Sequence, residues 1–427
     1  MSSRPIVGSP DVAHSVAPKC RFCSAELRQT FVDLGMSPLC QTQIAPEKLN
    51  EMEPFFPLHV YVCTSCFLVQ LEEFVKPDVI FGAEYPYFSS YSDSWVAHAK
   101  GYVDHVRQDF KVDSGSFVVE IASNDGYLLQ HFVKAGVRCL GIEPANGVAE
   151  AARARGVRTI TRFFGVATAT DVRRSDGPAQ LILGNNVLAH VPDLNDFVEG
   201  VRVLLDTDGF ATFEFPHLMQ LEELNQFDTI YHEHFSYFSF TTVRRVFEAH
   251  GLRLFDVKEL DTHGGSIRIY ACHANSNAHA ERPAVKGLEE REIAKGYRKP
   301  EHYLAFAKKV EETKRRLLAF LIQAKSENKQ VVGYGAPGKG NTLLNYCAIR
   351  CDFLDYTVDR NPHKQGTYTP GTRIPIHDPS RIFETKPDYV LILPWNLKKE
   401  VTQSMAGIKA WGGKFVVPIP SVQVLDG

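Results

Sequence analysis

The sequence predicts an α/β chain in which two Rossmann-like parallel-sheet blocks follow a small metal-binding module. Three observations predict it. Two CxxC pairs stand near the N-terminus, at Cys20 and Cys23 and at Cys63 and Cys66. A short apolar run enters a small-residue turn and an apolar-periodic segment at 118–129 (VVEIASNDGYLL), as a buried strand, a turn and a helix do. The same pattern returns at 331–345 (VVGYGAPGKGNTLLN).

Length and composition set the broad class. A chain of 427 residues is long enough for several domains. A net charge of −3 disfavours bulk nucleic-acid binding, which needs a basic face. No apolar run reaches the roughly 18 residues of a membrane span, and residues 1–14 carry no apolar signal core. We therefore expect a cytoplasmic protein without membrane or nucleic-acid partners.

The paired cysteines predict a structural zinc site. Cys20, Cys23, Cys63 and Cys66 supply four thiolates, which satisfy a tetrahedral ion and leave no open position for catalysis. Redox-active CxxC pairs are the alternative interpretation. Cys40 lies between the two pairs and is expected to be a bystander.

The first glycine turn predicts a cofactor site. Acidic residues surround its single glycine and would repel a pyrophosphate, so the turn suits S-adenosylmethionine, which is cationic and carries an adenosine. The next strand, 137–142, ends at an acid in the position where Rossmann-like sheets bind ribose hydroxyls. An ordinary βα turn is the alternative. The expected contacts are Glu120, Ala122, Asn124, Asp125, Gly126, Glu143, Pro144 and Asn186.

An aromatic and hydroxyl-rich segment at 84–95 precedes this block. It is either a surface loop packed on the next domain or a lid whose Tyr85, Tyr87, Ser89 and Ser90 face a polar ligand such as a sugar phosphate. A helix is expected at 94–110. Beyond the cofactor turn we expect strands at 180–183 and 209–215, helices at 218–227 and 239–251, and an antiparallel hairpin of 252–260 with 266–273.

The segment 231–237 (YHEHFSY) is the densest cluster of reactive side chains. A metal site is one interpretation, but the HExxH spacing is absent and no third ligand is evident. Histidines satisfied within the core are another. General acid–base chemistry is favoured, because an unperturbed histidine pKa near 6.5 suits proton transfer at neutral pH. His190, just past the strand at 180–183, lies at the ligand-bearing edge of such a sheet.

A charged helical pair at 284–330 connects to the last block. There, Gly333, Gly335 and Gly338 form a G-x-G-x-x-G turn, and a strand at 353–358 leads to Asp359. This is a dinucleotide fingerprint, and Lys339 suits phosphates. Further strands at 389–393 and 414–417 give a sheet of four or five strands, smaller than a full NAD domain. A nucleoside-diphosphate anchor, a nicotinamide site and an empty structural repeat all remain open.

Seven blocks in this order resemble the nucleotide-sugar C-methyltransferases of deoxysugar pathways, which install a branch methyl at C-3 of a 4-keto sugar. They are CxxC…CxxC, EYPYFSSYS, ExASNDGxLL, NNVLAHVPD, YHEHFSYFS, THGGSIR and GYGAPGKGNTLLN. The resemblance implies a flexible N-terminus (1–17), a zinc-binding module (18–80), a methyltransferase domain (81–283), a helical linker (284–330) and a nucleotide-sugar-binding domain (331–427).

The resemblance also implies residue roles. His234 would remove the C-3 proton, and Tyr85, His190, Tyr231 and Glu233 would line the sugar pocket. The expected substrate is a nucleotide-linked 4-keto sugar, with dTDP as its nucleotide, bound by a monomer or dimer. Residues assigned to the substrate are Tyr87, Ser89, Ser90, His263, Tyr334, Gly335, Lys339, Asn341 and Asp359.

Three other classes stay open from the sequence. A nicotinamide-dependent oxidoreductase acting on a nucleotide sugar would use the second glycine turn. A nucleic-acid methyltransferase with a zinc ribbon would need a basic stripe that the chain lacks. A non-catalytic scaffold built from the same modules would bind no ligand at either turn.

Overall fold

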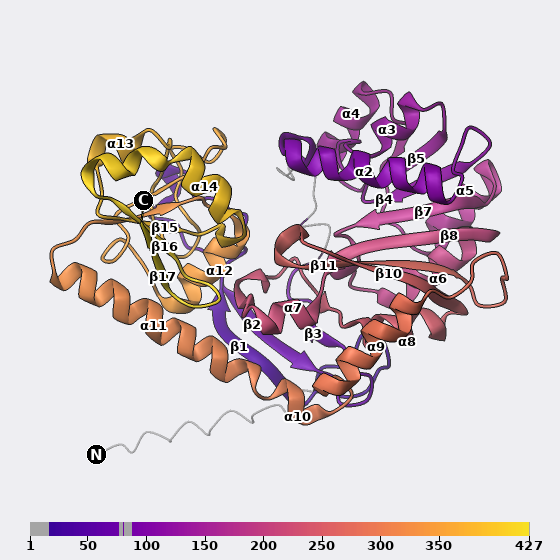
Figure 1. Cartoon of the computed structure of the whole chain (residues 1–427), viewed down its shortest axis with the longest axis horizontal. Helices are drawn as coiled ribbons and strands as arrows, with labels where there is room; N and C mark the ends of the chain where they lie inside the picture. Colours follow the sequence, from indigo (N-terminus) through magenta and orange to yellow (C-terminus); the bar gives the residue numbers. More distant parts are fainter. Residues whose placement is uncertain (1–16, 77–79, 81–87, 427) are drawn as a thin grey trace, which may run out of the picture.

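Three β-sheets organise the chain in the computed structural model, which describes residues 17–76, 80 and 88–426. The N-terminal sheet lies between and below two larger α/β blocks (Figure 1). The central block holds a seven-stranded sheet, and the C-terminal block holds a six-stranded sheet. The predicted fold class, a Rossmann-like methyltransferase block between a zinc module and a second α/β block, is confirmed.

The N-terminal sheet has four antiparallel strands in the order β1-β2-β3-β9. These are β1 (Gln29–Ser37), β2 (Phe56–Val62), β3 (Val69–Leu71) and β9 (Ser236–Tyr237). In β2, Leu58, Val60 and Val62 alternate toward the core, as a half-buried strand requires. The fourth strand, β9, belongs to the reactive segment 231–237, so this segment is part of the zinc module's sheet.

The central sheet has the order β10-β11-β8-β7-β4-β5-β6. Its strands are β4 (Phe117–Ile121), β5 (Arg138–Ile142), β6 (Thr159–Ile160), β7 (Ala179–Asn185), β8 (Leu205–Pro216), β10 (Leu252–Leu260) and β11 (Ser266–His273). The run from β6 to β8 is parallel, and the predicted β10–β11 hairpin is antiparallel. The order reverses between β5, β4 and β7, so their carboxyl ends border one crevice.

Helices cover both faces of the central sheet. Val118 of β4 packs with α2 and α3, whereas Val119 and Ile121 pack with α5 and α6 on the other face. The helices of this block are α2 (Asp93–Asp109), α3 (Leu129–Lys134), α4 (Asn146–Ala154), α5 (Val166–Asp176), α6 (Leu194–Leu204), α7 (Leu218–Glu223) and α8 (Phe240–Ala249). The predicted helix at 218–227 is wrong in its second half: Asn225 takes a left-handed φ of 52°, and a separate 3-10 turn, η4 (Phe227–Thr229), follows.

The helical linker has three helices where a pair was predicted. It contains α9 (Pro283–Lys295), α10 (Pro300–Tyr303) and α11 (Phe306–Ser326). Proline opens α9 and α10 in their first turns, where its missing N–H is not needed. Phe306 at the start of α11 stacks on Phe31 of β1, with ring centroids 4.7 Å apart. The linker is therefore packed on the N-terminal sheet.

The C-terminal sheet has six strands, not the expected four or five, in the order β14-β13-β12-β15-β16-β17. They are β12 (Val331–Tyr334), β13 (Thr357–Val358), β14 (Ile376–His377), β15 (Tyr389–Ile392), β16 (Lys414–Val417) and the antiparallel β17 (Gln423–Asp426). The predicted strand 353–358 is wrong except for its last two residues. Its first residues lie in a turn and loop, where the Asp355 carboxylate accepts hydrogen bonds from Lys325 and Gln330. The helices are α12 (Gly338–Cys347), α13 (Arg381–Thr385) and α14 (Lys398–Ser404).

The long interval between the two CxxC pairs crosses to the C-terminal block. Ile44 forms a β-bridge with Tyr368, and the Gly371 amide donates to Glu53 Oε1 at 2.7 Å. These two segments are therefore neighbours in space although they lie far apart in the sequence. Within the described residues, no helix is long and apolar enough to cross a membrane.

Candidate active site and cofactor site

The four paired cysteines converge on one point. Their Sγ atoms all lie within 4.8 Å of one another, with Cys20–Cys66 and Cys23–Cys63 at 3.5 Å. Zinc–sulfur bonds of about 2.3 Å in a tetrahedron correspond to sulfur separations of about 3.8 Å. The donor set fits a structural zinc ion with no open position, as predicted.

The cofactor turn is shaped by backbone conformations that few residues adopt. Ala122, Asn124 and Gly126 all have positive φ, at 56°, 49° and 77°. A Cβ on Gly126 would lie 3.0 Å from Val157 and 3.3 Å from the Ala152 backbone. The Asn124 amide donates to one oxygen of Glu143 and the Ala145 amide to the other, both at 2.9 Å. These bonds fix the turn against the end of β5.

Three buried carboxylates surround this turn and make it suitable for a cation. Glu120 is fully buried, and neither of its oxygens has a hydrogen-bond partner among the described residues. Burial, with the charges of Glu143 and Asp125, holds the pKa of Glu120 well above its usual range. Among the described residues, Arg155 offsets part of this charge through a 2.8 Å ion pair to Asp125. The orphaned carboxyl and the surplus of acids fit the ammonium and sulfonium groups of S-adenosylmethionine better than a phosphate.

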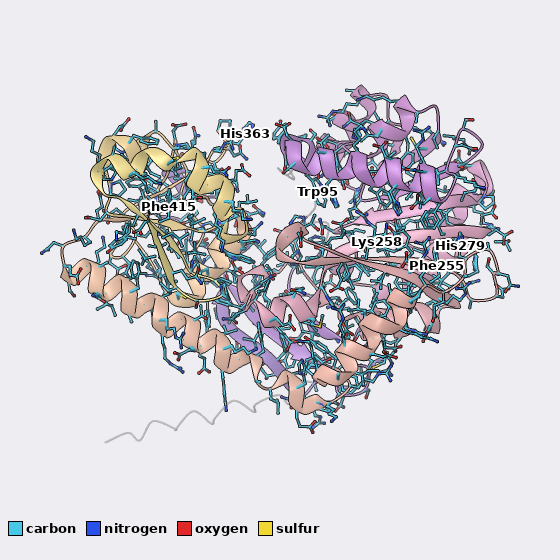
Figure 2. All side chains as sticks on the ribbon, viewed as in Figure 1. Trp95, Phe255, Lys258, His279, His363 and Phe415 are labelled. Carbon is cyan, nitrogen blue, oxygen red and sulfur yellow. The ribbon has the colours of Figure 1, made fainter. Side chains whose placement is uncertain are left out.

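The segment before α2 covers this turn. The Ser89 amide donates to Asn124 Oδ1 at 2.8 Å, and the Ser90 amide to Asp125 at 3.3 Å. The structure therefore brings both serines to the cofactor turn. Tyr85 and Tyr87 lie outside the described residues. Trp95 of α2 lies on the side of the central block that faces the C-terminal block, where Figure 2 also shows His363.

At the end of β7, Asn186 joins the turn to the hairpin loop. It has a φ of 54°, and its side-chain amide donates to Nε2 of His263 at 3.0 Å. Burial lowers the pKa of His263 to about 4, so its ring is neutral at pH 7. Pro144 lies between Glu143 and Ala145, at the carboxyl end of β5. The predicted cofactor residues therefore all lie at one edge of the central sheet.

His234 is held next to this edge in a defined tautomer. Its Nδ1 lies 2.8 Å from the Thr229 carbonyl oxygen, which only accepts, so the proton must be on Nδ1. The His190 ring lies 4.7 Å away and the Tyr231 ring 4.0 Å away, centroid to centroid. Burial, and then the charge of His190, keep the pKa of His234 well below its usual value. His234 is therefore a neutral imidazole, and no described residue hydrogen-bonds to its Nε2.

His190 also anchors the reactive segment 231–237. Its Nδ1 donates to the backbone carbonyl of Glu233 at 2.7 Å, and burial lowers the pKa of His190 to about 4. The Glu233 side chain contacts Cys40 of the N-terminal module. Its Oε1 lies 3.6 Å from Cys40 Sγ, which donates to it. Cys40 is not part of the four-cysteine cluster, as expected. No sequence motif signals its contact with Glu233, a residue 193 positions away.

The C-terminal block places a positively charged side chain, Lys339, near the reactive segment 231–237. Lys339, in the first turn of α12, is partly buried; its Nζ donates to Asn396 Oδ1 at 3.0 Å and lies 4.7 Å from the centre of the Trp395 ring. It forms no ion pair within the part of the chain that the structure describes. Trp395 Nε1 donates to Asp228 at 2.7 Å, one residue before the carbonyl that holds His234. Trp395 and Asp228 were missed because neither lies in a recognisable motif.

Other parts of the chain pack closely against the second glycine turn. A Cβ on Gly333 would lie 2.6 Å from Thr357, one on Gly335 2.6 Å from Pro394, and one on Gly338 2.9 Å from Cys40. Asp359 accepts the backbone amides of Ala336 and Asn361, both at 2.8 Å. Asn341 donates to the Cys40 carbonyl at 2.7 Å. The fingerprint is thus satisfied within the protein, which disfavours the nicotinamide interpretation.

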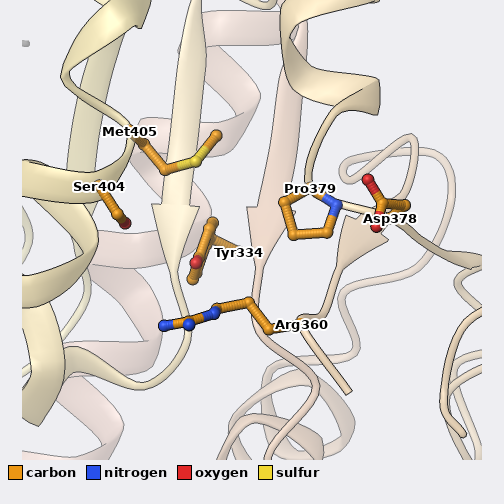
Figure 3. Close-up of a pocket in the computed structure, with 6 residues that line it drawn as sticks. All are labelled: Tyr334, Arg360, Asp378, Pro379, Ser404 and Met405. Atoms are coloured by element: carbon orange, nitrogen blue, oxygen red, sulfur yellow. The ribbon is translucent and has the colours of Figure 1, made fainter. Parts of the chain in front are cut away.

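A cavity of about 420 Å³ opens at the carboxyl edge of the C-terminal sheet. Figure 3 shows Tyr334 at its centre, between Met405 and Ser404 on one side and Pro379 and Asp378 on the other. Arg360 closes it below and pairs with Glu400 at 3.2 Å. Of the predicted substrate residues, only Tyr334 lines this cavity.

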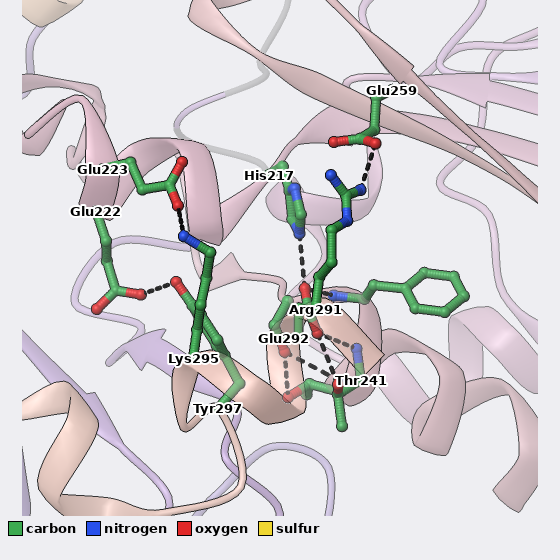
Figure 4. Close-up of polar contacts among 12 residues, drawn as sticks. His217, Glu222, Glu223, Thr241, Glu259, Arg291, Glu292, Lys295 and Tyr297 are labelled. Carbon is green, nitrogen blue, oxygen red and sulfur yellow. Dashed lines mark hydrogen bonds and ion pairs between the residues drawn. The ribbon is translucent and has the colours of Figure 1, made fainter. Parts of the chain in front are cut away.

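A buried carboxylate ties the linker to the central block. Glu292 of α9 accepts from the amides of Phe240 and Thr241, both at 2.7 Å, and from His217 Nε2 at 2.7 Å (Figure 4). It caps the first turn of α8 from another helix, because two of the amides there have no partner within α8. His217 directly follows β8, so the Glu292 side chain links α9, α8 and the end of β8.

Three family models match consecutive parts of the chain. A zinc binding domain model matches residues 20–81, a methyltransferase domain model residues 96–257, and a C-methyltransferase C-terminal domain model residues 261–420. Together with the carboxylate-rich turn and the four-cysteine site, they define a methyltransferase that uses S-adenosylmethionine and carries a structural zinc site.

A relative that matches nearly the whole chain narrows the class. The chain is 37% identical over 408 residues to the C-methyltransferase NovU of Streptomyces niveus, covering 96% of this chain and 97% of that protein. The chain therefore belongs to the S-adenosylmethionine-dependent C-methyltransferase family that includes NovU.

Solved structures resemble a smaller part of the molecule. Magnesium protoporphyrin IX methyltransferase of Synechocystis PCC 6803, with bound SAH, is 14% identical with a TM-score of 0.34, covering 42% of this chain and 83% of that one. The PH0226 protein of Pyrococcus horikoshii OT3 is 14% identical with a TM-score of 0.37, covering 45% and 99%. The family assignment rests on NovU and the domain models.

Proposed function

We propose that this protein methylates C-3 of a 4-keto deoxysugar linked to a nucleoside diphosphate, with dTDP as the nucleotide. Family membership supports carbon as the methylated atom. The observation that carries the proposal is the tautomer of His234: the Thr229 carbonyl holds the proton on Nδ1, which leaves Nε2 available as a base beside the cofactor edge.

The chemistry needs a carbon nucleophile, since an unactivated C–H bond does not attack a sulfonium. A ketone at C-4 acidifies the proton on C-3. Nε2 of His234 takes this proton, and the electron pair of the C–H bond becomes an enolate with its charge on the C-4 oxygen. Tyr231 flanks His234 and can donate to that oxygen; Tyr85 is a second candidate. His190 is neutral and its one N–H is bound to the Glu233 carbonyl, so it lines the pocket without donating there. One such donor is typically worth about 10²–10³ in kcat.

S-adenosylmethionine, when bound at the Glu120–Gly126 turn, supplies an electrophilic methyl group for the enolate carbon. Glu143 and Asn186 would hold its adenosine and methionine ends, and Glu120 its ammonium. Holding both reactants in one closed site contributes much of the rate, because it removes the entropy of their encounter. His234 then releases its proton to solvent.

The nucleoside diphosphate of the substrate is proposed to bind to the C-terminal block. Lys339 has no carboxylate partner among the described residues and is proposed to bind the diphosphate. The Tyr334 cavity, of a size typical for small-molecule sites, is proposed to take the nucleoside. His263, Asn341 and Asp359 support this surface through Asn186, Cys40 and Ala336. Because its zinc thiolates must stay reduced, we expect the protein to act in the cytoplasm.

Calorimetric titration with S-adenosylhomocysteine, dTDP and NADH tests the proposal. Binding of the first two at separate sites, without response to NADH, is expected. An assay with a dTDP-linked 4-keto deoxysugar should then give a product heavier by one methyl group. Binding of NADH alone would overturn the assignment.

A further inference from the structure

Cys40 stands where three parts of the chain meet. It is 4% exposed and belongs to the interval between the two zinc-binding pairs. Its thiol donates to Glu233 Oε1 at 3.6 Å, and its carbonyl accepts from Asn341 of α12 at 2.7 Å. The N-terminal module, the reactive segment and the C-terminal block are therefore joined through this one residue.

The third glycine of the second fingerprint makes room for this thiol. A Cβ at Gly338 would come within 2.9 Å of Cys40 Sγ, closer than real Cβ atoms approach other heavy atoms. In a dinucleotide site, the third glycine of the fingerprint serves close packing of helix against strand. Here the missing side chain of Gly338 leaves space for the Cys40 sulfur atom, which comes from the N-terminal module. The turn therefore accommodates Cys40.

We propose that Cys40 is a positioning residue for catalysis: its thiol hydrogen bond orients the Glu233 carboxylate toward the sugar pocket and favours its ionised form. This inference rests on the proposed function, in which Glu233 binds a sugar hydroxyl. An ionised carboxylate accepts from both the thiol and that hydroxyl, whereas a protonated one competes with them as a donor.

The charged and titratable groups around Glu233 agree with this role. Burial raises the pKa of Glu233 to about 7, and the Cys40 hydrogen bond and Lys364 act in the opposite direction. Lys364 itself is held by the Ala336 carbonyl at 2.8 Å. His190 donates to the Glu233 backbone carbonyl, and both His190 and His234 are neutral. Burial and Glu233 raise the pKa of Cys40 well above its usual value, so the thiol keeps its proton and remains the donor.

Infrared spectroscopy of the full-length protein without substrate tests the contact directly. The carboxyl band of Glu233, assigned by its loss in Glu233→Gln, is followed across pH in the wild type, Cys40→Ala, Cys40→Ser and Cys347→Ala. Cys347 is a buried cysteine of α12 and serves as the matched control. We expect Cys40→Ala to raise the Glu233 pKa by about one pH unit, Cys40→Ser to restore it, and Cys347→Ala to leave it unchanged.

Two further readouts separate this inference from the proposed function. The S–H band of Cys40 in the wild type should shift as Glu233 titrates, which needs no Cys40 variant. The acid limb of kcat/KM should move upward in Cys40→Ala with the carboxyl band. An unmoved carboxyl band in Cys40→Ala, or an S–H band insensitive to Glu233 titration, overturns the inference. Infrared shifts without a kinetic shift support the Cys40 contact and overturn the role of Glu233 in the reaction.

Discussion

His234 and Thr229 are joined by a 2.8 Å hydrogen bond from a ring nitrogen to a backbone carbonyl. The bond fixes the ring's orientation and tautomer without a carboxylate, and the buried ring is neutral. Histidine bases commonly use a buried acid for this purpose. Here the nearest acid in sequence, Glu233, turns toward Cys40 instead.

Replacing His234 by Ala should abolish proton removal and methyl transfer together. General base catalysis is typically worth about 10²–10⁴, so we expect kcat to fall by at least this factor. Deuterium exchange from solvent at C-3 measures proton removal by itself. His59→Gln, at a half-buried position of β2, is the control. Retained exchange and full methyl transfer in His234→Ala would remove His234 from the base role.

Gly126→Ala should weaken cofactor binding. An added Cβ meets Val157 and the Ala152 backbone, and the residue must keep a φ of 77°. Gly136→Ala is a matched control, because Gly136 has a φ of 70° but open space around its Cβ position. Calorimetry with S-adenosylhomocysteine should show at least a tenfold loss of affinity for Gly126→Ala only. Equal effects of both substitutions would mean that backbone strain, and not the cofactor turn, is responsible.

Lys339→Met should raise KM for the nucleotide sugar while leaving S-adenosylhomocysteine affinity unchanged. The variant keeps the length of the side chain and its packing on Trp395 but loses the charge. A charge-assisted contact is worth about 1.5–3 kcal/mol, so KM should rise about tenfold or more. Lys399→Met, on the exposed side of α14, is the control. An unchanged KM would exclude Lys339 as the diphosphate ligand.

The sequence predicted the elements whose signals are local. The CxxC pairs, the turn around Gly126 and the β10–β11 hairpin all carry their information within short segments. Contacts between blocks carry no such signal: Cys40 with Glu233, Trp395 with Asp228 and Ser236 with Gln70 join residues far apart in the chain. The second fingerprint was recognisable, but its use as a packing surface depends on neighbours such as Pro394 that only the fold brings near.

Cys63→Ser should release zinc and unfold the N-terminal sheet before the rest. The site has no spare ligand, since its four sulfur atoms complete a tetrahedron, and zinc typically contributes about 10–16 kcal/mol to such modules. Metal analysis and hydrogen exchange across residues 20–71 measure the two effects. Cys351→Ser replaces an exposed cysteine and should change neither. Undiminished zinc in Cys63→Ser would contradict the assignment.

Glu292→Ala should destabilise the fold. It leaves His217 and two amides of α8 without their buried partner, and such losses typically cost about 3–5 kcal/mol. Burial alone would raise the pKa of Glu292, but the hydrogen bonds and charge of His217 and the bonds from Thr241 lower it below 4.5. Its contribution is therefore present above pH 4.5 and lost as the pH falls through the lower, folded-state pKa.

Urea denaturation followed by tryptophan fluorescence, repeated from pH 8 down to well below pH 4.5, measures this contribution. Glu290→Ala, on the exposed face of the same helix, controls for helix propensity. Equal midpoints for Glu290→Ala and Glu292→Ala would show that the three-element junction adds nothing.

The pairing of β3 with β9 has a consequence for biosynthesis. Gln70 of β3 pairs with Ser236 of β9. Because the ribosome adds about 5–20 residues per second, Ser236 is synthesised roughly ten to thirty seconds after Gln70. During that time the zinc module can load its metal, but β3 is an open edge, the kind of surface that pairs with other chains. The nascent chain is therefore most exposed to misassembly before residues 231–237 emerge, because β9 (Ser236–Tyr237), at the end of this segment, closes the edge.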